Sequence, residues 1–342
     1  MNYPNFTTEH KSLMRKYLTK DVFEELKDKK TLNNFTLENA INSGVQNPDS
    51  GIGAYVGDQE SYTVFASLFD KIIEDYHGFT KDDTHKSNLN VDDLDAPLND
   101  DLDKYIVSTR IRVGRNLDNM PLGTSISIKQ RAEVESIVSN ALSSLEDDLK
   151  GTYYSLDGMS EEISSSLIKD HFLFKAGDRF LETAGLNRDW PKSRGIYHND
   201  NKTFLVWINE EDELRIISMQ NGGDIKTVFA RLIKAVKELE KKMSFSYSEH
   251  LGYITSCPTN LGTAMRASVH IKLPNLSNDM DRFQEIANKY FLQIRGIDGE
   301  HSKSVGGVFD ISNKRRLGVT EVQCVQDMYD GVIALIEVEK SL

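Results

Sequence analysis

The segment 256–274 constrains the fold more than any other part of the chain, because it joins a tight turn directly to a strand. Its second half alternates polar and apolar side chains, and Val269, Ile271 and Leu273 fall on one face of the predicted strand. Its first half contains Pro, Asn and Gly, which favour tight turns. The segment therefore predicts a strand that is entered through a structured turn.

Three chemically active side chains gather at the mouth of this strand, Cys257, Arg266 and His270. Binding and catalytic residues are commonly found on loops held by a rigid sheet. A buried structural cysteine and polar residues on a surface strand would explain this segment at least as well. The rest of the chain must decide between the two interpretations.

Length and composition bound the class of protein. The 342 residues predict two domains or one large domain, with 39% hydrophobic and 27% charged residues, as in an ordinary globular chain. No apolar run is as long as a membrane span, and the first residues contain no apolar signal core. Cys257 and Cys324 have neither a disulfide framework nor zinc-site spacing, which favours a reducing cytoplasm.

The net charge of −12 disfavours nucleic acid or an anionic membrane as a partner, but it permits an anionic nucleotide where positive charge is concentrated. The chain has no P-loop, no dinucleotide-binding glycine motif and no kinase catalytic loop. Bound phosphates would therefore have to be held by guanidinium groups, whose planar forks pair two oxygens at once. Five candidates lie on predicted strands or at their ends: Arg110, Arg112, Arg215, Arg266 and Arg295.

The first eighty residues read as short helices. The clearest is Ser61–His77, whose apolar residues recur every three or four positions. Tyr76 lies on that apolar face, so periodicity alone predicts that it packs in the core. The segment 81–104 contains Pro97, has six Asp between Val91 and Lys104, and shows no apolar periodicity, which predicts a solvated acidic linker.

The remainder mixes strands and helices. Strands are predicted over Tyr105–Arg115, in the second half of 256–274, and over 291–295 and 308–311, and a hairpin over 203–220. Capping signals predict helices over 127–149, after Asp224 and after Thr320, and a further helix is expected around 281–290. The residues 168–174 read as strand or turn. Four glycines in Gly296–Gly307 predict a mobile loop that closes over a bound nucleotide.

Several segments, in this order along the chain, resemble the signature sequences of the phosphagen (guanidino) kinases. They are Ser108–Arg112, Asp170–Phe174, Asn209–Asp212, Cys257–Pro274, and Arg295-Gly296 followed by Gly299-Glu300-His301. The likeness covers nearly the whole chain. It implies an α+β fold, with a small all-α N-terminal domain (1–80), the acidic linker (81–104) and a larger domain (105–342) with an antiparallel sheet flanked by helices.

The resemblance implies reversible transfer of the γ-phosphoryl group of ATP to a guanidinium, with Mg²⁺ carried by the phosphates and water and not by a protein metal site. Within the family the chain is most similar to the arginine kinases, because of its short loop Ser50–Tyr55 and because of Tyr76. Free L-arginine is therefore the expected acceptor, phosphoarginine and ADP the products, and energy buffering the role. Asp49 and Arg179 match a pair that bridges the two domains.

The resemblance also assigns residues to roles. The expected catalytic residues are Glu211, Cys257, Glu300, Arg215, Arg266 and Arg295. The expected ATP-binding residues are Ser108, Thr109, Arg110, Ile111, Arg112, His171, Arg215, Arg266, Ala267, Ser268, Val269, His270, Arg295, Gly296, Ile297, Asp298, Gly299, Glu300 and Asp310. The expected contacts to the guanidino substrate are Ser50, Gly51, Ile52, Gly53, Ala54, Tyr55, Tyr76, Glu211, Cys257 and Glu300.

In this scheme Glu211 and Glu300 hold the guanidinium, and the Cys257 thiolate beside them titrates below a free thiol. The amides of Gly51–Tyr55 grip the amino-acid end of the substrate. Four positions depart from the usual arginine-kinase pattern: Glu213, Asp298, Lys303 and Val305.

Two other classes of function stay open. One is a kinase for taurocyamine, lombricine, glycocyamine or creatine, and the other is a catalytically silent paralogue that binds nucleotide or arginine. A kinase that phosphorylates arginine side chains in proteins is less compatible with the helical N-terminal region. A monomer is expected in the cytoplasm, with a homodimer as the alternative.

Overall fold

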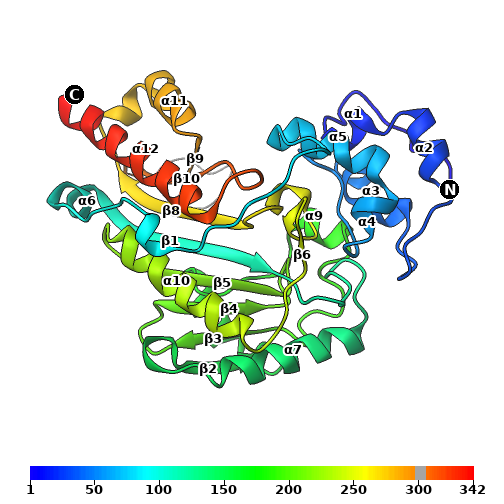
Figure 1. Ribbon diagram of the computed structural model, residues 1–342, viewed down its shortest axis with the longest axis horizontal. Helices are drawn as coiled ribbons and strands as arrows, with labels where there is room; N and C mark the ends of the chain where they lie inside the picture. The colour runs from blue at the N-terminus through cyan, green and yellow to red at the C-terminus, as the bar shows by residue number, and fades with distance from the viewer. Residues whose placement is uncertain (297–305) are drawn as a thin grey trace.

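The computed structural model describes residues 1–296 and 306–342. A small helical domain lies at one end of a larger domain built on a single main sheet (Figure 1). The predicted α+β architecture is confirmed. Within the described part of the chain, none of the helices has the length and apolar character needed to cross a membrane.

The N-terminal domain consists of short helices around its own apolar core. They are α1 (Leu13–Tyr17), α2 (Lys20–Leu26), α3 (Leu37–Gln46), α4 (Ser61–Val64) and α5 (Ala66–His77). The side chains of Ser12, Thr19 and Thr36 accept hydrogen bonds from backbone N–H groups in the first turns of α1, α2 and α3, which otherwise lack partners.

The predicted helix Ser61–His77 is two helices, because Phe65 leaves the helical conformation (φ −107°, ψ 27°). Its apolar face is buried as expected at Ile72 and Ile73. Tyr76 is different, since it is 45% exposed and lies beyond that core. The expectation from periodicity that Tyr76 packs in the core is therefore wrong.

The acidic segment 81–104 is less solvated than predicted. It contains η1 (Val91–Asp93) and the start of α6 (Asp100–Tyr105), and Leu94, Ala96 and Leu102 are buried in the core of the larger domain. Single apolar residues between the acidic ones reach that core without any periodic spacing, which is why the pattern did not reveal them. The domain boundaries themselves stay a prediction.

The main sheet is antiparallel, with strand order β2-β3-β4-β5-β1-β8-β10-β9. Its strands are β1 (Ile106–Arg115), β2 (Gly151–Ser155), β3 (Gly195–Asn199), β4 (Phe204–Ile208), β5 (Leu214–Asn221), β8 (Met265–Lys272), β9 (Leu292–Arg295) and β10 (Val308–Asn313). A separate small pair joins β6 (Tyr247–Ser248) to β7 (Gly252–Tyr253). The predicted hairpin is β4–β5.

The helices of the larger domain are α7 (Ile128–Leu142), α8 (Glu161–Lys169), α9 (Arg179–Thr183), α10 (Ile225–Glu240), α11 (Met280–Lys289) and α12 (Glu321–Ser341). Short 3₁₀ turns are η2 (Asp147–Leu149), η3 (Pro258–Asn260) and η4 (Leu276–Asn278). The predicted helix 127–149 stops at Leu142, and Asp147 further on has a left-handed backbone (φ 53°) that a helix cannot contain. The residues 168–174 are the end of α8 and a turn, not a strand.

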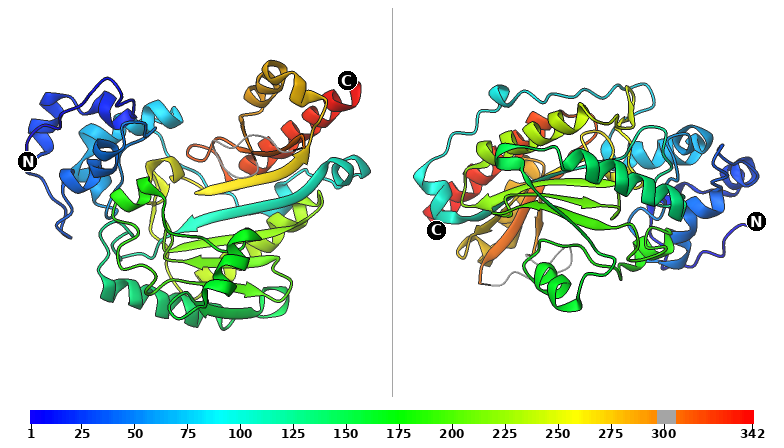
Figure 2. Two further views of the ribbon diagram at one scale, coloured as in Figure 1. Left: turned by 180° about the vertical axis from the view of Figure 1, so that it is seen from behind. Right: turned by 90° about the horizontal axis from the view of Figure 1, so that it is seen from below.

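The two faces of the sheet have different partners. On one face, Ile111 of β1 and Val269 of β8 pack in a core shared with α10 and α12, and these helices lie along that face (Figures 1 and 2). Antiparallel strands place directly opposed residues on the same side. The polar residues that alternate with this core therefore collect on the other face.

Candidate active site

Strand register brings all five predicted arginines to that second face. Arg112 of β1 pairs with Arg266 of β8, and Arg215 of β5 pairs with Gly114 of β1, two residues beyond Arg112. On the other side Arg295 pairs with Asp310, which in turn pairs with His270 of β8. We call this set the arginine face: Arg110, Arg112, Arg215, Arg266 and Arg295.

Electrostatics on the arginine face are unfavourable without an anion. Burial, with repulsion from Arg266 and Arg215, lowers the pKa of Arg110 to about 10. Burial and the same repulsion lower the pKa of Arg112 as well. Nε and Nη2 of Arg110 and Nε of Arg266 have no hydrogen-bond partner among residues 1–296 and 306–342. Buried cationic donors without partners are suited to an anion with several oxygens.

Carboxylates compensate part of this charge. Arg266 Nη2 donates hydrogen bonds to both carboxylate oxygens of Asp310, each over 2.9 Å. Arg215 Nη1 lies 2.7 Å from Glu210, and its Nη2 donates to Glu211 over 3.1 Å. Burial disfavours the charge of Arg215, but these carboxylates and Asp212 together raise its pKa.

Glu211 lies where the arginine face meets the turn that carries Cys257. Besides Arg215, it accepts a hydrogen bond from Asn260 Nδ2 (3.2 Å) in that turn. Burial raises the pKa of Glu211 to about 7, with repulsion from Asp212 and Glu210 adding to the effect. A carboxylate with this pKa is suited to exchange protons near neutral pH.

Cys257 is buried, with its Sγ 3.1 Å from Thr259 Oγ1. Burial raises the pKa of this thiol to about 12, and the charge of Glu211 acts in the same direction. The expectation of a thiol that titrates below a free cysteine is therefore wrong for this arrangement. That expectation considered only the positive charge nearby, whereas the pKa of the thiol responds more strongly to desolvation and to the adjacent Glu211 carboxylate.

The N-terminal loop Ser50–Tyr55 reaches the same corner. Tyr55 is buried against Cys257, Ala184 and Leu186. Its N–H donates to Ala40 O (2.9 Å), so this amide is already used. Within the described residues, the N–H groups of 51–54 have no backbone acceptor, and of these residues Gly51 and Ile52 are not buried, so their amides are accessible to a ligand.

The predicted link between the domains is present. Arg179 of α9 forms an ion pair with Asp49, with Nη1 donating to Oδ1 over 2.8 Å. Asn42 and Ser43 of α3 also donate to the backbone of α9, at Thr183 O (2.7 Å) and Phe180 O (2.9 Å).

The other predicted nucleotide residues divide into three groups. One group lies on the same side of the sheet as the arginine face: Ser108, Ser268, His270 and Asp310. His171 lies in the turn after α8. Burial is the main cause that lowers the pKa of His270, and His171 is close enough to lower it further. By alternation, Thr109, Ile111, Ala267 and Val269 point to the opposite face, so their side chains are not at the site. Gly296 continues β9 as an isolated bridge, and Ile297, Asp298, Gly299 and Glu300, with Lys303 and Val305, lie outside the described residues.

Sequence reasoning missed several members of the site. Arg316 lines the same cavity as Arg112, Arg215 and Arg266, and it donates to Asn260 Oδ1. The Trp207 ring lies against the guanidinium groups of Arg110 and Arg215, whose Cζ atoms are 5.2 and 5.7 Å from the ring centroid. A signal for Trp207 existed, because it lies on the same predicted hairpin as Arg215.

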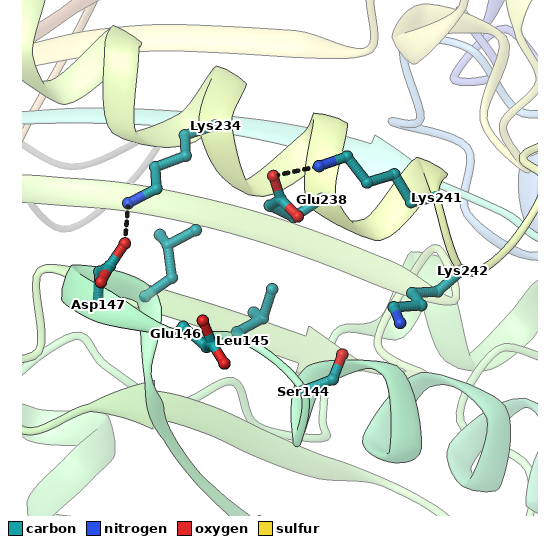
Figure 3. A pocket seen from close by; sticks show the side chains of 9 residues that line it. Ser144, Leu145, Glu146, Asp147, Lys234, Glu238, Lys241 and Lys242 are labelled. Atoms are coloured by element: carbon teal, nitrogen blue, oxygen red, sulfur yellow. Dashed lines mark hydrogen bonds and ion pairs between the residues drawn. The ribbon is translucent and has the colours of Figure 1, made fainter.

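A second cavity lies away from this site, beside α10 (Figure 3). Two of its three lysines form ion pairs with acids, Lys234 with Asp147 (3.3 Å) and Lys241 with Glu238 (2.6 Å). The balanced charge and the position on the helix-covered side separate it from the arginine face. No group of three or more His, Cys, Asp or Glu side chains that could hold a metal is found in the described residues.

Comparison with known proteins agrees with this geometry. The model of the "ATP:guanido phosphotransferase, C-terminal catalytic domain" matches residues 133–342, and the N-terminal domain model of the same family matches residues 8–74. Arginine kinase Met e 2 from Metapenaeus ensis is 56% identical over 337 residues, which are 98% of this chain and 94% of the relative. An arginine kinase from Artemia franciscana is also 56% identical, over 338 residues, with the same shares covered.

Solved structures show the same fold. A lombricine kinase superposes with a TM-score of 0.94 at 39% identity, over 99% of this chain and 94% of that one. The duplicated taurocyamine kinase from Schistosoma mansoni gives 0.91 at 43% identity, over 97% of this chain and 47% of that one. The chain therefore belongs to the ATP:guanido phosphotransferase family.

Proposed function

We propose that the protein catalyses reversible transfer of the γ-phosphoryl group of ATP to the guanidinium of free L-arginine. The observation that carries this proposal is the junction of two half-sites. A face of buried arginines adjoins a corner formed by Glu211, Cys257 and the N-terminal loop Ser50–Tyr55. An anionic donor fits the first half-site, and a cationic acceptor fits the second.

The arginine face is proposed to bind the phosphates of ATP. In the transfer, a bond forms between a guanidinium nitrogen and the γ-phosphorus, the bond from that phosphorus to the bridging oxygen breaks, and ADP leaves with the electron pair. During this step charge is spread over the equatorial oxygens of the transferring group and develops on the leaving oxygen of ADP, so preorganised guanidinium groups stabilise the transition state more than the bound ATP.

Glu211 is proposed to orient the acceptor and take its proton. The attacking nitrogen loses a proton as the new bond forms, and a carboxylate with a pKa of about 7 can accept it near neutral pH. Glu300 is proposed as the second carboxylate on the guanidinium, by resemblance alone.

Mg²⁺ is proposed to enter bound to the nucleotide. The donor groups on the arginine face are cationic, so they fit phosphate oxygens and not a metal ion. When bound, Mg²⁺ would neutralise phosphate charge while keeping much of its water shell. The protein's own part is to fix the phosphates relative to the acceptor.

Arginine as the acceptor rests on the relatives and on the pocket. The 56% identical relatives are arginine kinases, whereas the named lombricine and taurocyamine kinases are 39% and 43% identical. The short loop Ser50–Tyr55 is proposed to receive the amino-acid end through its free amides, and Tyr76 is proposed to contact the substrate. A cytoplasmic monomer that binds neither nucleic acid nor membrane completes the proposal.

A panel of acceptors tests this function. ADP production is measured with ATP, Mg²⁺ and either L-arginine, D-arginine, creatine, glycocyamine, taurocyamine or lombricine. We expect turnover with L-arginine alone. Turnover only with another guanidine would overturn the reading of the loop and Tyr76 while keeping the arginine face, and no turnover by a folded, ATP-binding protein would indicate a silent paralogue.

A further inference from the structure

We call the corner formed by Glu211, Cys257 and the loop Ser50–Tyr55 the acceptor corner. A buried set of hydrogen bonds, which we call the junction, joins the loop that carries Glu211 to the segment that carries Cys257. Its centre is Asn116, the residue after β1, which has no exposed surface. Asn116 Nδ2 donates to Asp212 Oδ1 and to Ile254 O, both at 2.9 Å, and its Oδ1 accepts from Glu213 N at 2.9 Å. The amide thus connects the loop that carries Glu211 with the segment that leads to Cys257.

Asp212 extends the junction toward Cys257. Its Oδ1 also accepts from Ser256 N (3.3 Å), and Ser256 O accepts from Val56 N (2.9 Å), next to Tyr55 of the substrate loop. Asp212 is 2% exposed, and burial raises its pKa while the Asn116 hydrogen bond opposes that shift. Three segments distant in sequence are therefore joined through two buried side chains.

The surrounding backbone is shaped for this contact. A side chain at Gly114 would bring its Cβ to 2.7 Å from Asp212 Oδ2, so glycine is needed for the carboxylate to pass that close to β1. The Asp212 carboxylate therefore lies directly against β1 at Gly114. Among the described residues, neither Asn116 nor Asp212 forms a hydrogen bond with an arginine of the arginine face, although Asp212 lines the same cavity as Arg215.

We propose that Asn116, with Asp212, is a positioning pair that sets the spacing between the Glu211 carboxylate and the Cys257 turn. The pair touches no reacting atom, and it acts on turnover through the alignment of the acceptor. This inference rests on the proposed guanidine phosphorylation. A displacement of about 1 Å in an aligned site can lower the rate about a hundredfold.

The test compares Asn116→Ala with Asn199→Ala. Asn199 is also buried, and its side chain likewise makes several hydrogen bonds, to Asp148 O, Thr203 and Phe204 N, at the end of β3 away from the acceptor corner. We expect Asn116→Ala to lower kcat with L-arginine about a hundredfold while ATP affinity, measured by direct binding, stays within about threefold. Asn199→Ala should lower the melting temperature and leave kcat of the folded protein within about threefold.

Labelling of Cys257 gives a readout that a loss of stability alone would not produce. Because the junction holds the residue before Cys257, Asn116→Ala should increase the alkylation rate of this thiol, located by peptide mapping, and Asn199→Ala should not. Should Asn116→Ala fail to fold, Asn116→Asp with Asp212→Asn restores the donor–acceptor pair in reverse. That double variant should turn over faster than Asn116→Asp alone.

Three results separate the possibilities. Wild-type protein without activity on L-arginine overturns the proposed function itself. Active wild type together with a folded Asn116→Ala of normal kcat and normal labelling overturns the positioning pair. No gain of the exchanged double variant over Asn116→Asp also overturns it.

Discussion

The two halves of the site are built in different ways. The arginine face is made by strands whose register places each arginine opposite another site residue, as Arg112 is opposite Arg266 and Arg215 is opposite Trp207. The acceptor corner is made by loops from three parts of the chain, held by side-chain hydrogen bonds to backbone. Strand register tolerates little local change, whereas a loop junction depends on single buried groups. The donor half should therefore fail through loss of charge, and the acceptor half through loss of alignment.

The largest expected effect is on the donor half. Arg266→Ala removes a buried cationic donor and its ion pair with Asp310, so kcat should fall by about 10²–10³ or more. Arg231→Ala is a matched control, because this partly buried arginine bonds Ser218 and Gln220 from α10 on the opposite face. Normal turnover by Arg266→Ala in a steady-state assay would contradict the phosphate assignment.

The next effect is on the acceptor half. Glu211→Gln keeps the size of the side chain but cannot take a proton, and kcat should fall by about 10². In the wild type, kcat/KM should decline as the pH falls through about 7, because the base becomes protonated. The variant should lose that decline, and a pH profile with the same acid limb in both proteins would assign the proton to another group.

A smaller effect is expected at the thiol. Cys257→Ala should lower kcat by less than Arg266→Ala does, because the raised pKa of about 12 keeps the thiol neutral near pH 7. Iodoacetamide should label Cys257 of the free protein more slowly than a small free thiol at pH 8. Faster labelling would show that the thiolate is stabilised in solution, as the sequence alone suggested.

The smallest effect concerns stability. Burial raises the pKa of Glu213 to about 8, against 4.5 for an ordinary glutamate, and its Oε1 has no hydrogen-bond partner in the described residues. The folded state therefore binds a proton that the unfolded state has released between these values. Stability should fall as pH rises through this range, by about 1.4 kcal/mol per pH unit.

Glu213→Gln should remove that slope, so its melting temperature should exceed that of the wild type most clearly near pH 8. Glu339→Gln is the control, because both oxygens of this buried carboxylate accept backbone hydrogen bonds, from Asn275 N (2.9 Å) and Leu276 N (2.7 Å). Equal melting temperatures of wild type and Glu213→Gln at pH 6 and at pH 8 would show that Glu213 is charged in the fold.

The same contrast explains what the sequence could predict. Alternation along β1 and β8 is a local signal, so the strands and the common face of Arg110 and Arg112 could be inferred directly. The family resemblance supplied the expected role of Glu211 on the guanidinium and its place beside Cys257. The junction at Asn116 could not be inferred, because it depends on contacts between residues about 100 and 140 positions apart.

Two other differences have the same physical origin. The pKa of Cys257 depends on burial, which residue types near it in sequence do not reveal. Tyr76 follows the helical period of α5, but that period does not say where the core ends.

Phosphorus NMR of ATP, Mg²⁺ and L-arginine with catalytic amounts of the protein tests the central claim most directly. The account predicts a new resonance of a nitrogen-bound phosphoryl group that grows with that of ADP, and that reverts to ATP when ADP is added in excess. Arg266→Ala should produce neither change on the same timescale. Inorganic phosphate as the only new species, or ATP left unchanged by a folded wild-type protein, would contradict the account.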